Sequence, residues 1–148
     1  MASERIDLAA LDKEGLKAQA AAYHGQGYNC AQAVLCTLAP TLGCDVDTAF
    51  RLMEGFGLGM GGMSETCGAL SGAVAALGMA ASGGTANPRT KAGTYRLSRA
   101  AVERFQAKNS SSVCGELKGV TGAHGMLRSC PGCIDDAIDI AVDLLREL

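Results

Sequence analysis

Hydrophobic positions recur along this chain with the spacing of helices, most clearly near the C-terminus. Four apolar residues there lie three or four positions apart: Ile134, Ile138, Val142 and Leu145. This spacing places apolar side chains on one side of an amphipathic helix. Pro131 suits the first turn, where its missing N–H is not needed. The pattern predicts a helix that begins at Pro131, with Cys130 at the cap position.

Five further segments have the composition or spacing of helices: 6–23, 30 to about 38 or 42, 48–54, 64–81 and 88–108. The first is expected to be peripheral, and the fourth to be central. Four residues with good N-cap side chains precede or begin the later ones: Asn29, Asp47, Ser64 and Asn87. The polar stretch 109–129 predicts at most one short helix, after Ser112.

A glycine-dense segment precedes the central helix, with five glycines among residues 55–62. Glycine costs a helix roughly 1 kcal/mol relative to alanine, so this segment is predicted to be a loop. We expect its backbone N–H groups, at Gly59, Gly61 and Gly62, to approach Cys67 and bind a thiolate or a cofactor. The segment also matches a dinucleotide-binding fingerprint, but no strand precedes it, which argues against that function.

The chain as a whole predicts an all-α fold. No segment shows the alternation of a strand, and aromatic residues make up only 4% of the sequence. The expected architecture is a compact single domain, residues 1–148, formed by a bundle of about five to seven helices.

Charge and hydropathy exclude several function classes. The net charge is -2, and the basic residues are scattered, so nucleic-acid binding is not expected. No apolar leader and no apolar stretch long enough for a membrane span is visible. We therefore expect a cytoplasmic protein with no membrane partner.

Cysteine is the residue type that points to chemistry. The chain has seven cysteines, and without an export signal these favour redox or metal chemistry over a secreted disulfide scaffold. Four are predicted at helix starts: Cys30, Cys67, Cys114 and Cys130. A helix start offers free N–H groups and a partial positive charge, which stabilise a thiolate. We expect these four to share one site, whereas Cys36 and Cys44 are more typical of structural or surface thiols.

The sharpest local motif is Cys130–Pro131–Gly132–Cys133. A Cys-x-x-Cys at a helix start is typical of thiol–disulfide exchange, with Cys130 as the attacking thiolate and Cys133 as the resolving thiol. Arg128 would favour the thiolate. The same motif is also half of many metal sites.

Three interpretations remain open at this point. The first is a redox protein that uses clustered thiols for disulfide or electron-transfer chemistry. The second is a protein that binds an iron–sulfur cluster or another metal, with Cys30, Cys67, Cys114 and Cys130 as the four ligands. The third is a helical scaffold with incidental cysteines. An unidentified redox partner is expected, and a homodimer is one option.

Several of these segments together resemble the family named for its cysteine pattern, C_GCAxxG_C_C, whose members are described as redox-active. The matching segments are 29–31, 65–72, 114–117 and 129–131, with the glycine-rich run before Cys67. Thr66-Cys67-Gly68-Ala69 stands where the pattern has Gly-Cys-Ala. The resemblance extends from about Tyr23 to the C-terminus. It implies a helical fold and redox-active cysteines.

Overall fold

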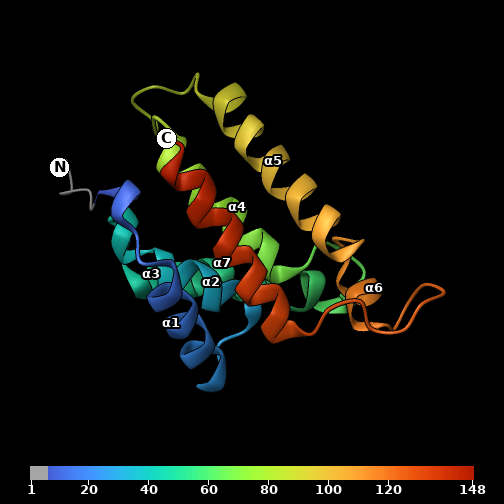
Figure 1. The fold of residues 1–148 in the computed structure, drawn as a ribbon. Helices are drawn as coiled ribbons and strands as arrows, with labels where there is room; N and C mark the ends of the chain where they lie inside the picture. The colour runs from blue at the N-terminus through green and yellow to red at the C-terminus, as the bar shows by residue number, and fades with distance from the viewer. Residues whose placement is uncertain (1–6) are drawn as a thin grey trace.

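The computed structural model describes residues 7–148 and contains seven α-helices and no strand in that range (Figure 1). The helices are α1 (Lys13–Gly25), α2 (Cys30–Leu38), α3 (Val46–Met53), α4 (Gly68–Ala81), α5 (Lys91–Asn109), α6 (Cys114–Lys118) and α7 (Cys130–Arg146). The predicted all-α bundle of five to seven helices is confirmed. The one β-type pairing in the described part of the chain is an isolated bridge between Thr66 and Val113.

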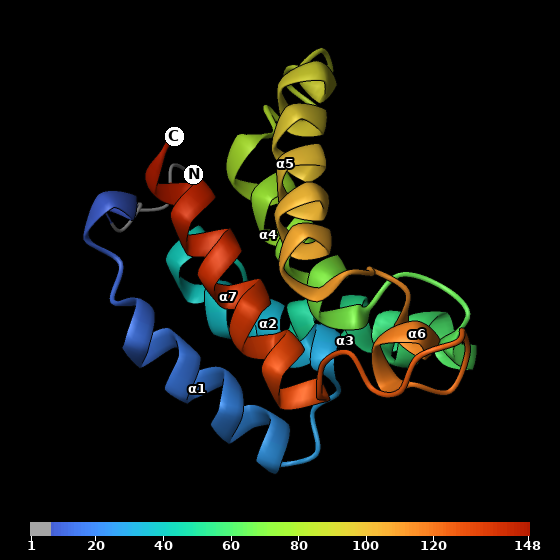
Figure 2. The same cartoon turned by 45° about the vertical axis from the view of Figure 1, so that its right-hand side comes forward.

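Helices α4 and α7 form the centre of the fold. α7 packs against α1, α2, α4 and α5, and α4 packs against α2, α5 and α7. Figure 2 shows α1 along the outer side of α7, and α5 beside α4. α7 buries its apolar stripe completely, for example at Ile138 and Val142. The starts of α2, α4, α6 and α7 lie at the same end of the bundle.

Small residues let α4 and α2 approach each other closely. A Cβ atom at Gly72 would lie 2.9 Å from the backbone oxygen of Ala31 and 2.9 Å from the Cβ of Val34. Real side chains do not come this close, so the glycine is needed for the packing of these two helices. This contact holds the starts of α2 and α4 at a fixed separation.

A matched pair of substitutions tests this contact. Gly72→Ala should lower the free energy of unfolding by about 1–3 kcal/mol, because the new methyl group forces the α2 backbone away. Gly78→Ala, in the same helix, has its nearest neighbour at 3.8 Å and should instead stabilise the protein by up to about 1 kcal/mol. Urea unfolding under reducing conditions measures both. Equal shifts for the two variants would contradict the close approach.

Several predicted helix starts are wrong. The helix expected over 6–23 covers Lys13–Gly25, with Asp12 as its cap and a short 3-10 turn, Leu8–Ala10, before it; residue 6 lies outside the described residues. Asp45 rather than Asp47 caps α3. The last helix begins one residue earlier than expected, since Ser129 is its cap and Cys130 is its first residue.

Backbone hydrogen bonds explain two further differences in helix starts. The helix expected from Ser64 begins at Gly68, because Thr66 forms the bridge to Val113 and the Cys67 N–H donates to the Ser112 carbonyl. The helix expected at Pro88 begins at Lys91, because the Asn87 N–H donates to Gly84 in a turn. A bond to a distant segment replaces the predicted cap at Ser64, and a bond within a local turn replaces it at Asn87.

The glycine-rich segment is more ordered than the predicted loop. It contains a 3-10 turn, Glu54–Phe56, and a turn of π-helical pattern, Gly59–Met63. Leu58, Met60 and Met63 have positive φ angles of 55°, 63° and 62°. Positive φ is uncommon for residues other than glycine, so backbone strain is concentrated beside the starts of α4 and α6.

Along residues 7–148, no helix combines the length and the apolar character that a membrane crossing requires.

Candidate functional site

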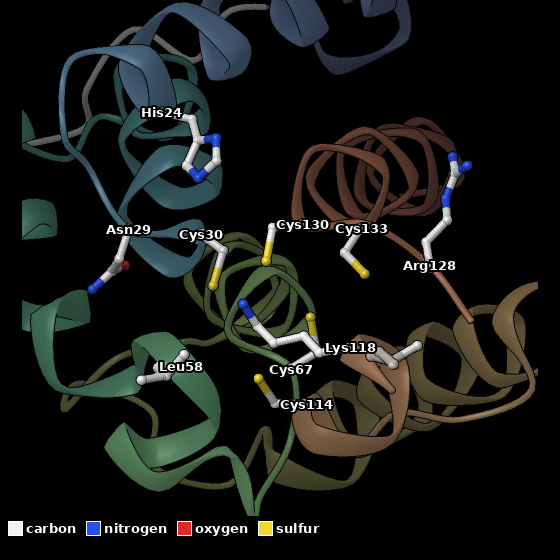
Figure 3. A pocket seen from close by; sticks show the side chains of 11 residues that line it. His24, Asn29, Cys30, Leu58, Cys67, Cys114, Lys118, Arg128, Cys130 and Cys133 are labelled. Atoms are coloured by element: carbon white, nitrogen blue, oxygen red, sulfur yellow. The ribbon is translucent and has the colours of Figure 1, made fainter. Parts of the chain in front are cut away.

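Five cysteines line one cavity of about 190 Å³ at the end of the bundle where four helices begin (Figure 3). They are Cys30 from α2, Cys67 at the cap of α4, Cys114 from α6, and Cys130 and Cys133 from α7. The other lining residues are His24, Asn29, Leu58, Leu117, Lys118 and Arg128. The structure thus brings together all five cysteines that the sequence singled out.

Asn29 fixes the position of Cys30. Its side chain accepts a hydrogen bond from the Gln32 N–H, and the Gln32 side chain accepts from the Asn29 N–H, both at 2.9 Å. Asn29 was expected as the cap, and the reciprocal bond to Gln32 adds to the stability of this helix start. The Asn29 amide also donates to the Glu54 carbonyl at 2.9 Å. These bonds hold the start of α2, with Cys30 as its first residue, against the turn that follows α3.

Two backbone hydrogen bonds hold Cys67 and Cys114 near each other. The Cys67 N–H donates to Ser112 at 2.7 Å, and the Cys114 N–H donates to Glu65 at 2.9 Å. These bonds flank the Thr66–Val113 bridge. The pairing places the first residue of α6 beside the first turn of α4.

The segment before α7 is anchored to α6. The N–H groups of Leu127 and Arg128 both donate to the Leu117 carbonyl, at 2.8 and 3.1 Å. Ser129 then caps α7, with its hydroxyl accepting from the Gly132 N–H at 3.1 Å. Cys130 and Cys133 consequently face the same cavity as Cys114.

Cys67 has the electrostatic environment of a thiolate. A hydrogen bond from the Cys133 thiol lowers the pKa of Cys67 to about 7, against the opposing effect of burial. The N–H groups of Leu70 and Ala69 and the ammonium of Lys118 contribute to this lower pKa. Conversely, the hydrogen bond to Cys67, together with burial, raises the pKa of Cys133. Both shifts favour the proton on Cys133 and the negative charge on Cys67.

The thiols of Cys30 and Cys114 hold their protons more strongly than the thiol of Cys67 does. Burial raises the pKa of Cys30, although the N–H groups of Leu58 and Ala31 at its sulfur partly oppose this. Burial likewise raises the pKa of Cys114, against the charge of Lys118. Cys30 and Cys114 are thus neutral neighbours of the Cys67 thiolate.

Lys118 and His24 are lining residues that the sequence analysis missed. A hydrogen bond with Cys130 raises the pKa of Lys118, so its ammonium is a positive charge among the sulfurs. Figure 3 shows the Lys118 side chain reaching toward Cys30 and Cys130. Lys118 lies four residues after Cys114, one helical turn along the same face, and this spacing was a readable signal. His24 had no comparable signal, because it meets the cavity only through the packing of α1.

The three glycines expected to approach Cys67 do not line the described cavity. Gly59 instead packs on Cys114, whose Cβ would lie 2.5 Å from a Cβ at this position. Gly61 and Gly62 face open space. The backbone N–H groups at the sulfurs come from Leu58 and from the first turns of α2 and α4, because a helix start already presents free N–H groups there.

Arg128 is committed to a carboxylate. Its guanidinium donates to both oxygens of Asp136, at 3.0 and 3.1 Å, and Lys108 adds an ion pair at 2.9 Å. The Asp136 side chain is 1% exposed. Gly132 leaves the space through which Arg128 passes. Arg128 therefore orients the start of α7, and its charge is largely balanced.

The spacing of the cysteine sulfurs limits which metals they can hold. Thiolates bound to a single zinc ion at about 2.3 Å lie at most about 4.6 Å from one another. Among the described residues, no three cysteine sulfurs lie within 4.8 Å of one another. The thiols therefore do not fit a single tetrahedral ion as arranged, while a cluster of several irons spans a larger volume and fits the donor type. Within residues 7–148 the one compact acidic group, Asp135, Asp136 and Asp139, is engaged by basic side chains.

Cys36 and Cys44 lie outside this cavity. The Cys36 thiol is buried and donates to the Val46 carbonyl at 3.7 Å, and burial raises its pKa to about 11. Cys44 donates to the Asp45 carbonyl at 3.5 Å. Neither has the surroundings of a reactive thiol.

Comparison with known proteins yields one similarity. No curated protein and no solved structure matches the chain. The sequence profile of one protein family, described as "Putative redox-active protein (C_GCAxxG_C_C)", matches residues 28–144. That range includes all five cysteines of the cavity. The chain therefore belongs to the C_GCAxxG_C_C family.

Proposed function

We propose that this protein is a thiol–disulfide redox protein in which Cys67 is the attacking thiolate and Cys133 is its resolving partner. The observation that carries the proposal is the contact between these two thiols across α4 and α7, inside a cavity lined by five cysteines. We assign Cys67 the role that the local motif suggested for Cys130, because the hydrogen bond from Cys133 favours the negative charge on Cys67.

The proposed exchange is balanced in two steps. The Cys67 thiolate attacks a sulfur of an incoming disulfide, forms a mixed disulfide, and releases the other half of the incoming molecule as a thiolate. The Cys133 thiol then loses its proton to that leaving thiolate and attacks the Cys67 sulfur. This releases the second half as a thiolate and forms the Cys67–Cys133 disulfide. The protein loses two electrons, and the incoming disulfide gains two.

A second candidate is an iron–sulfur cluster held by Cys30, Cys67, Cys114 and Cys130. It is favoured by the convergence of these thiols from four helix starts, together with the N–H groups that point at the Cys30 and Cys67 sulfurs. Hydrogen bonds to sulfur ligands are a common feature of such sites. A bound cluster would supply one-electron transfer.

One preparation distinguishes the two functions. The protein is purified anaerobically, analysed for iron and visible absorbance, and then treated with one equivalent of diamide. We expect a colourless, iron-free protein that loses two thiols per chain, and peptide mapping should identify a Cys67–Cys133 disulfide. Stoichiometric iron with visible absorbance would overturn the proposal in favour of the cluster.

Two control variants keep this test specific. Cys36→Ala and Cys44→Ala remove thiols outside the cavity and should leave the loss of two thiols unchanged. A disulfide that involves Cys36 or Cys44 in the parent protein would contradict the assignment to the cavity.

A further inference from the structure

The charge of the cavity points to the kind of molecule that exchanges with it. Its described lining contains no Asp or Glu, but it contains Lys118, Arg128 and His24. Asp136 balances the charge of Arg128. Lys118 has no carboxylate within 4.0 Å in the described part of the chain, so its ammonium is the unbalanced cation of the site.

Sulfur provides the countercharge of Lys118 in the reduced protein. The ammonium lies close to Cys130 and interacts with the thiolate of Cys67. Oxidation of Cys67 and Cys133 to a disulfide removes that negative charge. A half-buried cation then remains in a cavity without an acidic residue, a state that an incoming anion would relieve.

Size and polarity restrict the anion to a small molecule. The cavity volume is about 190 Å³, and Leu58 and Leu117 contribute apolar walls. This space suits a few carbon atoms with one charged group, and it does not suit a folded polypeptide.

We propose that the thiol which reduces the oxidised protein is a small thiol bearing a carboxylate or another anionic group, held by Lys118. This inference rests on the proposed thiol–disulfide function. Two molecules of the thiol are consumed. The first, as a thiolate, attacks the Cys67–Cys133 bond and forms a mixed disulfide, and the second attacks that mixed disulfide. The products are the small disulfide and the reduced protein, which gains two electrons.

Three small thiols of different charge test the inference. The oxidised protein is reduced with 3-mercaptopropionate, 2-mercaptoethanol or cysteamine, and the rate at which the Cys67 thiol returns is divided by each reagent's thiolate concentration. We expect 3-mercaptopropionate to react about tenfold faster than 2-mercaptoethanol, as a charge-assisted contact implies, and cysteamine to react slowest. The preference should weaken at high salt.

Variants of Lys118 identify the source of the preference. Lys118→Met should bring the three rates to within about twofold of one another, whereas Lys118→Arg should retain the order. Lys91→Met changes an exposed lysine on α5 and serves as the matched control. It should show the same order of rates as the parent protein. Equal rates for the three thiols in the parent protein, or an unchanged order in Lys118→Met, would overturn the inference.

The two proposals fail in different ways. If diamide forms no Cys67–Cys133 disulfide, the proposed function itself is wrong. If that disulfide forms but is reduced without regard to the charge of the thiol, only the role of Lys118 in binding an anion is wrong.

Discussion

Cys133→Ala should slow the alkylation of Cys67 by about fivefold to fiftyfold near neutral pH. The Cys133 thiol donates the hydrogen bond that contributes most to the low pKa of Cys67, so its removal raises that pKa from about 7. A hydrogen bond to a charged group is worth about 1.5–3 kcal/mol, which corresponds to one to two pKa units. Well below the parent pKa, the thiolate fraction falls by the full tenfold to hundredfold that this shift implies, and at pH 7 by about half of it.

Iodoacetamide labelling from pH 5 to 10, with mass spectrometry of the Cys67 peptide, measures this effect. In the parent protein the labelling rate should rise with a midpoint near pH 7, and in Cys133→Ala the midpoint should move upward. Cys133→Ser is the matched control, because its hydroxyl retains a donor and should keep much of the shift. Identical midpoints in the parent and Cys133→Ala proteins would show that Cys133 does not stabilise the Cys67 thiolate.

Asp136→Asn should lower the free energy of unfolding by about 3–5 kcal/mol, the usual cost of breaking a buried ion pair. Asp136 is fully buried and binds Arg128 and Lys108, which would lose their countercharge. Since marginal stability is typical of proteins of this size, a change this large would leave a considerable part of the protein unfolded at 37 °C.

Low pH should also lower the free energy of unfolding, because it protonates Asp136. Burial raises the pKa of Asp136, but the hydrogen bonds from Arg128 and Lys108 outweigh it, and the net pKa lies below the ordinary value of 3.8. The stabilisation from this carboxylate is therefore complete above about pH 4 and is lost as the pH falls through the lower folded-state pKa. Urea unfolding between pH 2 and 7 should show less acid sensitivity in Asp136→Asn than in the parent protein.

Asp135 provides the comparison for both measurements. Its side chain is 47% exposed and pairs with Lys17 at 3.5 Å. Asp135→Asn should change the stability by no more than about 1 kcal/mol, as exposed pairs usually do. If the two asparagine variants are equally stable, the buried ion pair does not hold the start of α7.

Local signals predicted the fold class and the position of most helices. Asn29 caps α2, and the apolar stripe beginning at Ile134 is buried as expected. These features depend on a few neighbouring residues, so the sequence contains them directly. Ser64 and Asn87 also have good capping side chains, but hydrogen bonds to distant or turn residues override that preference, and such bonds are not visible in a local pattern.

The sequence predicted which cysteines lie in the cavity, but it did not predict which two of them contact each other. Thiolate chemistry at helix starts selects Cys30, Cys67, Cys114 and Cys130 from residue type and position alone. The contact between Cys67 and Cys133 depends on how α4 packs on α7, and the local Cys-x-x-Cys motif pointed to Cys130 instead. His24 was missed for the same reason, since only the packing of α1 brings it to the cavity. Lys118 was missed although its spacing from Cys114 was a readable signal.

The meeting of four helix starts has a thermodynamic consequence for the whole bundle. Neighbouring helices that run in opposite directions place unlike partial charges side by side, whereas here the positive ends of α2, α4, α6 and α7 share one small volume with Lys118. Their mutual repulsion opposes folding, and negative charge on sulfur reduces it. The oxidation state of one cysteine pair should therefore change how tightly these four helix ends are held together. Oxidation or reduction in the cavity should change the rigidity of that whole end of the protein.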